Sequence, residues 1–160
     1  MTKNDYMIFI VIAIFIAVFS FTNFAHTDEQ KAGVVKNVSG KAFIERNKTV
    51  KSVNVKDSLM EKDILITGHD GSMGIIFQDN SVMSIGPNTR IIISKFLFNP
   101  AAEKLSFTAQ IKKGTVVYLT GLIAKLNRSG VRFETPSSVC GIRGTHFAIK
   151  VEDNEELIIQ

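Results

Sequence analysis

Apolar positions divide the chain into two unequal parts. Residues 7–19 are an unbroken apolar run of 13 residues, which predicts one hydrophobic helix. Beyond residue 32, apolar residues alternate with polar ones or form short clusters between turn residues, a pattern typical of β-strands. Strands are predicted at 33–38, 41–46, 49–55, 63–67, 72–78, 81–85, 89–95, 104–111, 115–120, 131–134, 146–152 and 156–159.

Residues that favour turns separate most of these predicted strands. They are Ser39-Gly40, the stretch from Gly68 to Gly71, Asp79-Asn80, Gly86-Pro87-Asn88 and Asn99-Pro100. Long helical periodicity is absent from this part of the sequence. The best helix candidate is the short stretch from Gly121 to Arg128, for which a loop or a single turn is an equal alternative.

Strands this short and closely spaced predict an all-β fold. The spacing fits sandwiches, barrels and β-solenoids alike. Apolar clusters at 75–77, 82–85 and 91–93 recur at about the same pitch, and stacked coils would bring such clusters into one core. We therefore predict a short-stranded β-solenoid-like or β-roll domain over residues 33–160, preceded by one N-terminal hydrophobic helix.

The apolar run is shorter than the roughly 20 residues that a membrane-spanning helix needs, and it fits the core of a secretory signal peptide. We predict that residues 1–25 are a signal peptide or an N-terminal membrane anchor, followed by a linker at 26–32. Cleavage is predicted near residue 21 or 26, and without it residues 7–25 would be the only contact with the membrane. A buried core helix is the third interpretation. The chain is thus predicted to be exported to the periplasm or cell envelope.

The formal net charge of +4 is carried by lysines that recur every few residues, which is typical of solvated strand edges. Nucleic-acid binding would favour denser arginine and aromatic residues on one face, so it is not predicted. Weak attraction to an anionic membrane surface or wall polymer is compatible with this charge.

Few residues in the sequence suggest chemistry. The three histidines, His26, His69 and His146, lack metal-ligand spacing, and no helix follows the glycines as a phosphate loop requires. The carboxylates lie in or beside turns, where capping explains them. The lone cysteine, Cys140, is predicted to be a small buried residue. We predict no enzyme and no catalytic, cofactor or metal site.

Residues 131–147, VRFETPSSVCGIRGTHF, resemble the end of the FecR-type periplasmic domain, and further motifs match in order over about residues 34–151. Two residues depart from the family pattern. Glu61 replaces the glycine of Gly-Asp, and Asn80 replaces the glycine of Asp-Gly-Ser. The residues that carry the resemblance as structural motif positions are Gly40, Asp63, Thr67, Asp79, Asn80, Ser81, Pro87, Gly114, Thr135, Pro136, Arg143, Gly144, Thr145 and Phe147.

The resemblance implies a β-rich, solenoid-like domain that works outside the cytoplasmic membrane as a binding or sensing module. Its expected partners are an envelope protein or a glycan, and a homo-oligomer is an open alternative. The long C-terminal region of the iron-citrate regulators and a cytoplasmic anti-sigma part are expected to be missing, so their full signalling role is not carried over. The second hypothesis is a structural or adhesive β scaffold that associates with itself.

Arg143 lies in the densest motif of the chain, between Ile142 and Gly144. We interpret it as a structural latch whose guanidinium donates to carbonyl groups at a corner of the fold. The functional alternative is an anion site for a carboxylate or phosphate of a partner.

Overall fold

A computed structural model describes residues 31–142 and 146–152 of the chain. A short 3-10 helix η1 (Pro100–Ala102) and a short helix α2 (Leu122–Leu126) accompany the strands. The strands are β1 (Lys31–Ser39), β2 (Ala42–Arg46), β3 (Thr49–Ser52), β4 (Ser58–Met60), β5 (Ile64–Thr67), β6 (Ser72–Phe77), β7 (Val82–Ile85), β8 (Arg90–Asn99), β9 (Lys104–Leu119), β10 (Val131–Glu134), β11 (Val139–Gly141) and β12 (His146–Val151).

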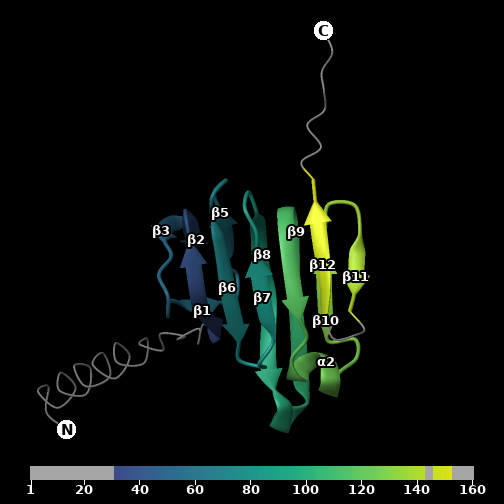
Figure 1. The fold of residues 1–160 in the computed structure, drawn as a ribbon. Coiled ribbons are helices and arrows are strands. Elements are labelled where there is room, and N and C mark those ends of the chain that lie inside the picture. Colours follow the sequence, from purple (N-terminus) through teal and green to yellow (C-terminus); the bar gives the residue numbers. More distant parts are fainter. Residues whose placement is uncertain (1–30, 143–145, 153–160) are drawn as a thin grey trace, which may run out of the picture.

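The strands form one curled sheet in the shape of a half-barrel (Figure 1), with the order β3-β2-β5-β8-β9-β7-β6-β1-β4. The pairings are antiparallel except for β10, which runs parallel to β9. The first half of β9 pairs with β8 and β10, and its second half pairs with β7 and β12. The long strand β9 therefore joins the two layers of the curl.

Gly114 is the point at which β9 changes from one layer to the other. It has φ +98°, a backbone conformation that side chains with a Cβ rarely adopt. A Cβ at this position would also collide with Thr89, which comes from the turn before β8. Because backbone geometry and space both require glycine here, the bend belongs to the fold itself.

The core lies between the two layers and is rich in aromatic rings. Phe107 of β9 is fully buried at its centre, with the ring centroids of Phe77 and Tyr118 4.9 Å and 5.5 Å away. Phe133 and Phe147 continue the cluster on β10 and β12, with centroids 4.9 Å apart. Edge-to-face and offset ring pairs of this kind add to the free energy gained from burial. The period-2 pattern of the sequence supplies these inward positions.

The sequence predicts most of the strands, with three differences. The predicted strands at 104–111 and 115–120 are one continuous strand, because the bend at Gly114 keeps both halves in the ladder. The short strands β4 and β11 were not predicted. The candidate helix at 121–128 is confirmed as the shorter α2. The predicted strand at 156–159 lies outside the described residues.

The all-β class is confirmed, whereas the solenoid-like arrangement is not observed in the described residues. The clusters at 75–77 and 82–85 form an antiparallel hairpin, with Ile75 opposite Met83. The cluster at 91–93 lies in the other layer, between β5 and β9. Their regular pitch therefore reflects similar hairpin lengths and not stacked coils.

The turn before Asp63 shows that the residue in place of the family glycine is Lys62 and not, as predicted from the sequence, Glu61. The residue directly before Asp63 is Lys62, which has φ +71°, so the left-handed position that favours glycine is occupied by this lysine. Glu61 instead has a function of its own, since its carboxylate accepts the backbone N–H of Phe96 at 3.0 Å. Asn80 has φ +62°, as expected for an asparagine in place of glycine.

The predicted signal peptide or anchor at 1–25 and most of the linker at 26–32 lie outside the described residues. Within the described part of the chain, no helix has the length and apolar character that crossing a membrane requires.

Candidate binding groove

Asp63, a motif residue, lies at the start of β5 and is fully buried. It binds the Arg46 guanidinium through two hydrogen bonds of 2.7 Å and accepts the backbone N–H of Met60 at 2.9 Å. Arg46 also donates to the carbonyl of Ser58 at 2.9 Å. The bidentate geometry ties the end of β2 to the β4–β5 turn. Asp63 is thus a joint between strands and does not face a cavity.

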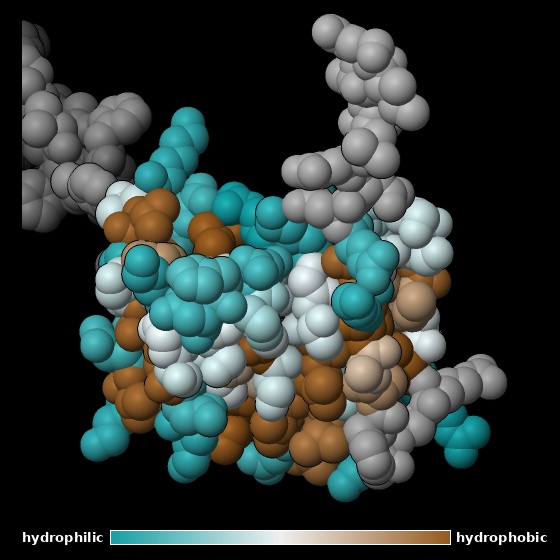
Figure 2. Space-filling view, turned by 45° about the horizontal axis from the view of Figure 1, so that its top comes forward, coloured by the Kyte–Doolittle hydropathy of each residue, from teal (hydrophilic) through white to brown (hydrophobic). Residues whose placement is uncertain are grey.

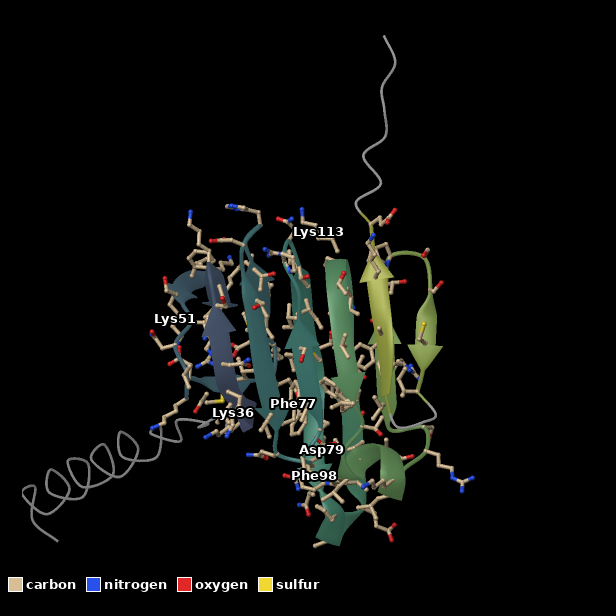
Figure 3. All side chains as sticks on the ribbon, in the orientation of Figure 1. Lys36, Lys51, Phe77, Asp79, Phe98 and Lys113 are labelled. Carbon is tan, nitrogen blue, oxygen red and sulfur yellow. The ribbon has the colours of Figure 1, made fainter. Side chains whose placement is uncertain are left out.

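Asp79, which is labelled in Figure 3, and Ser81 form a second joint, at the turn between β6 and β7. Both are fully buried, and the Asp79 carboxylate accepts the Ser81 hydroxyl at 2.6 Å. Its other oxygen accepts the backbone N–H of Ile123 at 3.2 Å, while its carbonyl accepts that of Leu122 at 2.7 Å. Asp79 therefore caps the start of α2 from a distant part of the sequence.

Thr67 and Pro87 belong to a third joint, between β5 and the turn before β8. The Thr67 hydroxyl donates to the carbonyl of Gly86 at 2.7 Å and accepts the backbone N–H of Thr89 at 3.0 Å. Pro87 is exposed in the turn, and its carbonyl accepts the Thr89 hydroxyl at 3.1 Å. These bonds hold the turn on β5.

Gly40 lies in the β1–β2 turn with φ +61°. A Cβ there would collide with the carbonyl oxygen of Asp70, so the turn packs directly on the loop before β6. Phe147 packs against the core, with its ring centroid 5.6 Å from that of Tyr118. The other motif residues of this segment, Arg143, Gly144 and Thr145, lie outside the described residues, so the latch and the anion site stay predictions.

Thr135 and Pro136 occupy the turn between β10 and β11. The Thr135 hydroxyl accepts the backbone N–H of Ser138 at 3.0 Å and donates to its carbonyl at 3.2 Å. These two motif residues differ from the rest because they line a surface groove. They are the positions where the family motif meets a feature that could bind a partner.

The groove has a volume of about 580 Å³ and lies between the β10–β11 turn and the end of β12. Within the described residues, β11 pairs only with β10 and β12 only with β9, so both strands have one free edge (Figure 1). The groove therefore opens at the side of the curl that the sheet does not close. Its lining residues are Lys112, Thr135, Pro136, Ser137, Ser138, Cys140, Lys150, Val151 and Glu152.

The groove is polar and carries charges of both signs. The Lys150 ammonium and the Glu152 carboxylate lie 2.8 Å apart, which raises the pKa of Lys150 and lowers that of Glu152 through their shared hydrogen bond. Lys112 is exposed on β9, and none of the ion pairs found among the described residues includes it. Hydroxyl groups and a lysine ammonium on one wall suit a partner with backbone carbonyls or a carboxylate.

The structure contradicts the prediction that Cys140 is buried. It is free and half-buried, and it lies on the wall of the groove. Its neighbour on β11, Val139, is 64% exposed. The prediction was wrong because it took apolar neighbours as a sign of burial, whereas these residues lie on a short edge strand.

The described residues contain no group of three or more histidine, cysteine, aspartate or glutamate side chains that could hold a metal ion. His69 lies exposed in its turn, with Nδ1 3.8 Å from a carboxylate oxygen of Asp70. His26 and the side chain of His146 lie outside what the structure describes. The buried carboxylates of Asp63 and Asp79 bind backbone and side-chain donors of the fold, so they are not arranged around a cleft.

An antiparallel sheet curled around an aromatic core, with a polar groove at its open side, defines this chain as a small all-β domain. The sequence model of the FecR protein family matches residues 63–159, more than half of the 160 residues, so the chain belongs to the FecR family. This is a regulatory and signalling family, which makes a sensing or regulatory module the coarse function. The upstream resemblance, at residues 34–62, lies before the matched residues.

The comparisons with curated proteins and with solved structures gave no match to this chain.

Proposed function

We propose that this chain is an exported, non-catalytic binding and sensing module of the cell envelope, and that its groove receives an extended segment of an envelope protein. The observation that carries this proposal is the position of the groove beside the free edges of β11 and β12. A free strand edge offers unpaired N–H and C=O groups, to which an extended peptide can add as a further strand. Membership of a regulatory family supports the sensing role.

The edge of β11 is suited to this kind of pairing. Natural edge strands are usually protected by lysines or prolines, but β11 consists of Val139, Cys140 and Gly141 and carries no charge. By contrast, β3 at the far edge of the sheet carries Lys51 and follows Lys48. The two edges therefore differ in the protection that discourages unspecific strand pairing. A glycan cannot continue the ladder of an edge strand as an extended peptide does, so we favour a protein segment.

Site-specific photo-crosslinking in cells tests this function. A photoreactive residue replaces Ser137 at the groove in the full chain, and a matched one replaces Ser52 on β3, which is also exposed. We expect one envelope protein to be captured at position 137 and not at position 52. Lys112→Glu should reduce this capture, because it reverses the charge of an exposed cation on the groove wall.

The same products from both positions, or none from position 137, would reject the groove as the binding site. Export is tested separately by N-terminal sequencing of the chain recovered from the envelope fraction. Recovery of the full-length chain in the soluble cytoplasm would reject the exported role, whatever the crosslinking shows.

A further inference from the structure

The end of the sheet at which the described chain begins also carries α2. The carbonyl of Ala32 accepts the backbone N–H of Gln78 at 2.9 Å, and the carbonyl of the next residue, Asp79, accepts that of Leu122 at 2.7 Å. The start of β1 and the start of α2 are thus held by two consecutive residues of one turn. Figure 1 shows both at the lower part of the sheet, and we call this region the α2 end.

Two exposed leucines lie on α2. Leu122 is 37% exposed and Leu126 is 59% exposed, whereas Ile123 between them is buried in the core. Residues four apart lie on the same face of a helix, so the two leucines form one small apolar surface. Single exposed apolar residues are ordinary, but an apolar surface beside cationic side chains is a combination that also allows an element to lie at a membrane interface.

Cationic side chains lie beside this apolar surface and farther along the same end of the sheet. The exposed cationic residues at the α2 end are Lys31, Lys62, Lys104, Lys125 and Arg128. They lie at the start of β1, just before β5, in the β8–β9 hairpin, and within and just after α2. The side chain of Asn127 donates to the carbonyl of Leu105 at 3.0 Å, which holds the α2 segment against that hairpin.

Acidic side chains offset little of this charge. Among the described residues of the α2 end, Asp63 and Asp79 are fully buried and bonded, and Glu61 accepts the backbone N–H of Phe96. Glu103, in the β8–β9 hairpin, is exposed. The described residues of this end are therefore basic on balance.

The N-terminal part of the chain joins the described domain at Lys31, which lies at this end. An extended chain spans at most about 3.5 Å per residue, so Lys31 stays within about 20 Å of residue 25. The apolar run of residues 7–19 lies just before that position in the sequence. The groove lies at the opposite end, because the β10–β11 turn and the end of β12 line it.

We propose that the α2 end docks on the surface of an anionic lipid bilayer. Leu122 and Leu126 enter the interfacial region, and the lysines and Arg128 of this end lie at the headgroups. Attraction to an anionic surface amounts to roughly a fivefold gain in affinity for each cationic side chain near it. In this orientation the groove faces away from the membrane and stays open to a partner. The proposal concerns a different surface from the groove, so the two can fail separately.

A fluorescent probe whose emission reports polarity tests the proposal in the full chain. In a Cys140→Ser background, the probe is attached to Leu126→Cys at the α2 end or to Ser137→Cys at the opposite end. Vesicles of phosphatidylcholine are compared with vesicles that contain about one third phosphatidylglycerol. We expect a blue shift and quenching by shallow spin-labelled lipid only for position 126 and only with the anionic vesicles.

Charge reversal then tests the role of the cations. The double variant Lys125→Glu and Arg128→Glu should lower the ratio of lipid-exposed to water-exposed probe by about twentyfold or more. The matched control Lys41→Glu, on an exposed residue of the other end, should leave it unchanged. Circular dichroism checks that each variant keeps the β spectrum.

Three results would overturn the proposal. One is a probe at position 126 that stays in water with anionic vesicles. Another is an equal response to both kinds of vesicle. The third is a blue shift that needs no vesicles and grows with protein concentration, since this would assign the surface to a second copy of the chain.

Discussion

Removal of the charge on Asp63 should destabilise the fold more than any exposed ion pair can. In Asp63→Asn the amide keeps the shape of the side chain and one acceptor oxygen for the Met60 N–H. What it loses is the charge that faces Arg46 through two hydrogen bonds of 2.7 Å. The substitution therefore isolates the ion pair from the packing around it.

The expected magnitude follows from the burial of the two partners. Breaking a buried ion pair costs about 3–5 kcal/mol, because the remaining charge loses its partner without regaining water. The Asp63 side chain is fully buried but that of Arg46 is 29% exposed, so water can solvate part of the guanidinium. We therefore expect the lower end of the range, about 3 kcal/mol. For a chain of this size this lowers the melting temperature by about 6–12 °C.

Urea unfolding of the full chain, followed by circular dichroism, measures this loss. The matched control is Glu45→Gln, the same change from carboxylate to amide in the Glu45–Arg90 pair, whose atoms lie 3.0 Å apart with side chains 24% and 38% exposed. Because both of these side chains reach water, whereas Asp63 does not, this pair should contribute at most about 1 kcal/mol. Equal losses in the two variants would refute the reasoning, because burial would then not determine the cost.

Three further variants or reagents test other parts of the structure. Gly114→Ala should lower the free energy of unfolding in urea by at least about 2 kcal/mol, because at φ +98° a Cβ collides with Thr89. The control Gly141→Ala, whose Cβ meets open space, should be nearly neutral, and equal losses would contradict the requirement for glycine at the bend. Cys140 should react with a maleimide before denaturant is added, because it is half-buried on a groove wall; reaction only after unfolding would restore the buried thiol. The Tyr118 hydroxyl is buried, which raises its pKa, and the Ser81 side chain is near it without forming a hydrogen bond of good geometry. Tyr118→Phe should therefore change stability by less than about 1 kcal/mol; a loss of about 2 kcal/mol or more would show that the bond to Ser81 is formed.

Local sequence patterns predict the strands because each pattern has a local physical cause. The turn at Asp79-Asn80 is a good example, since Asn80 takes the left-handed conformation that its short polar side chain tolerates. The apolar alternation of β12 likewise puts Phe147 on the face that packs on the core, where its ring contacts Tyr118 and Phe133. Alternation specifies which face is buried, but it does not specify which strand lies next to which.

Features that depend on distant residues were not predicted. Arg46 and Asp63 are 17 residues apart, and nothing in either local pattern indicates that they meet. The start of α2 is capped by Asp79, 44 residues earlier, although the sequence shows Asp79 only as a turn former. Burial of Cys140 was predicted from its apolar neighbours, whereas the residue is only half-buried because β11 is an edge strand. In each case the sheet order supplies information that a single segment does not contain.

The placement of the motif residues limits what family membership can say about the partner. Asp63, Thr67 and Asp79 are buried and bind turns or a helix start, so their substitution would change the fold before it changed any surface. The groove is lined instead mostly by side chains outside the motif, such as Lys112 and Lys150. Two FecR domains could therefore share the same joints and bind different partners. It follows that the partner of this chain must be sought through its groove, and that substitutions there should change binding while the urea midpoint stays constant.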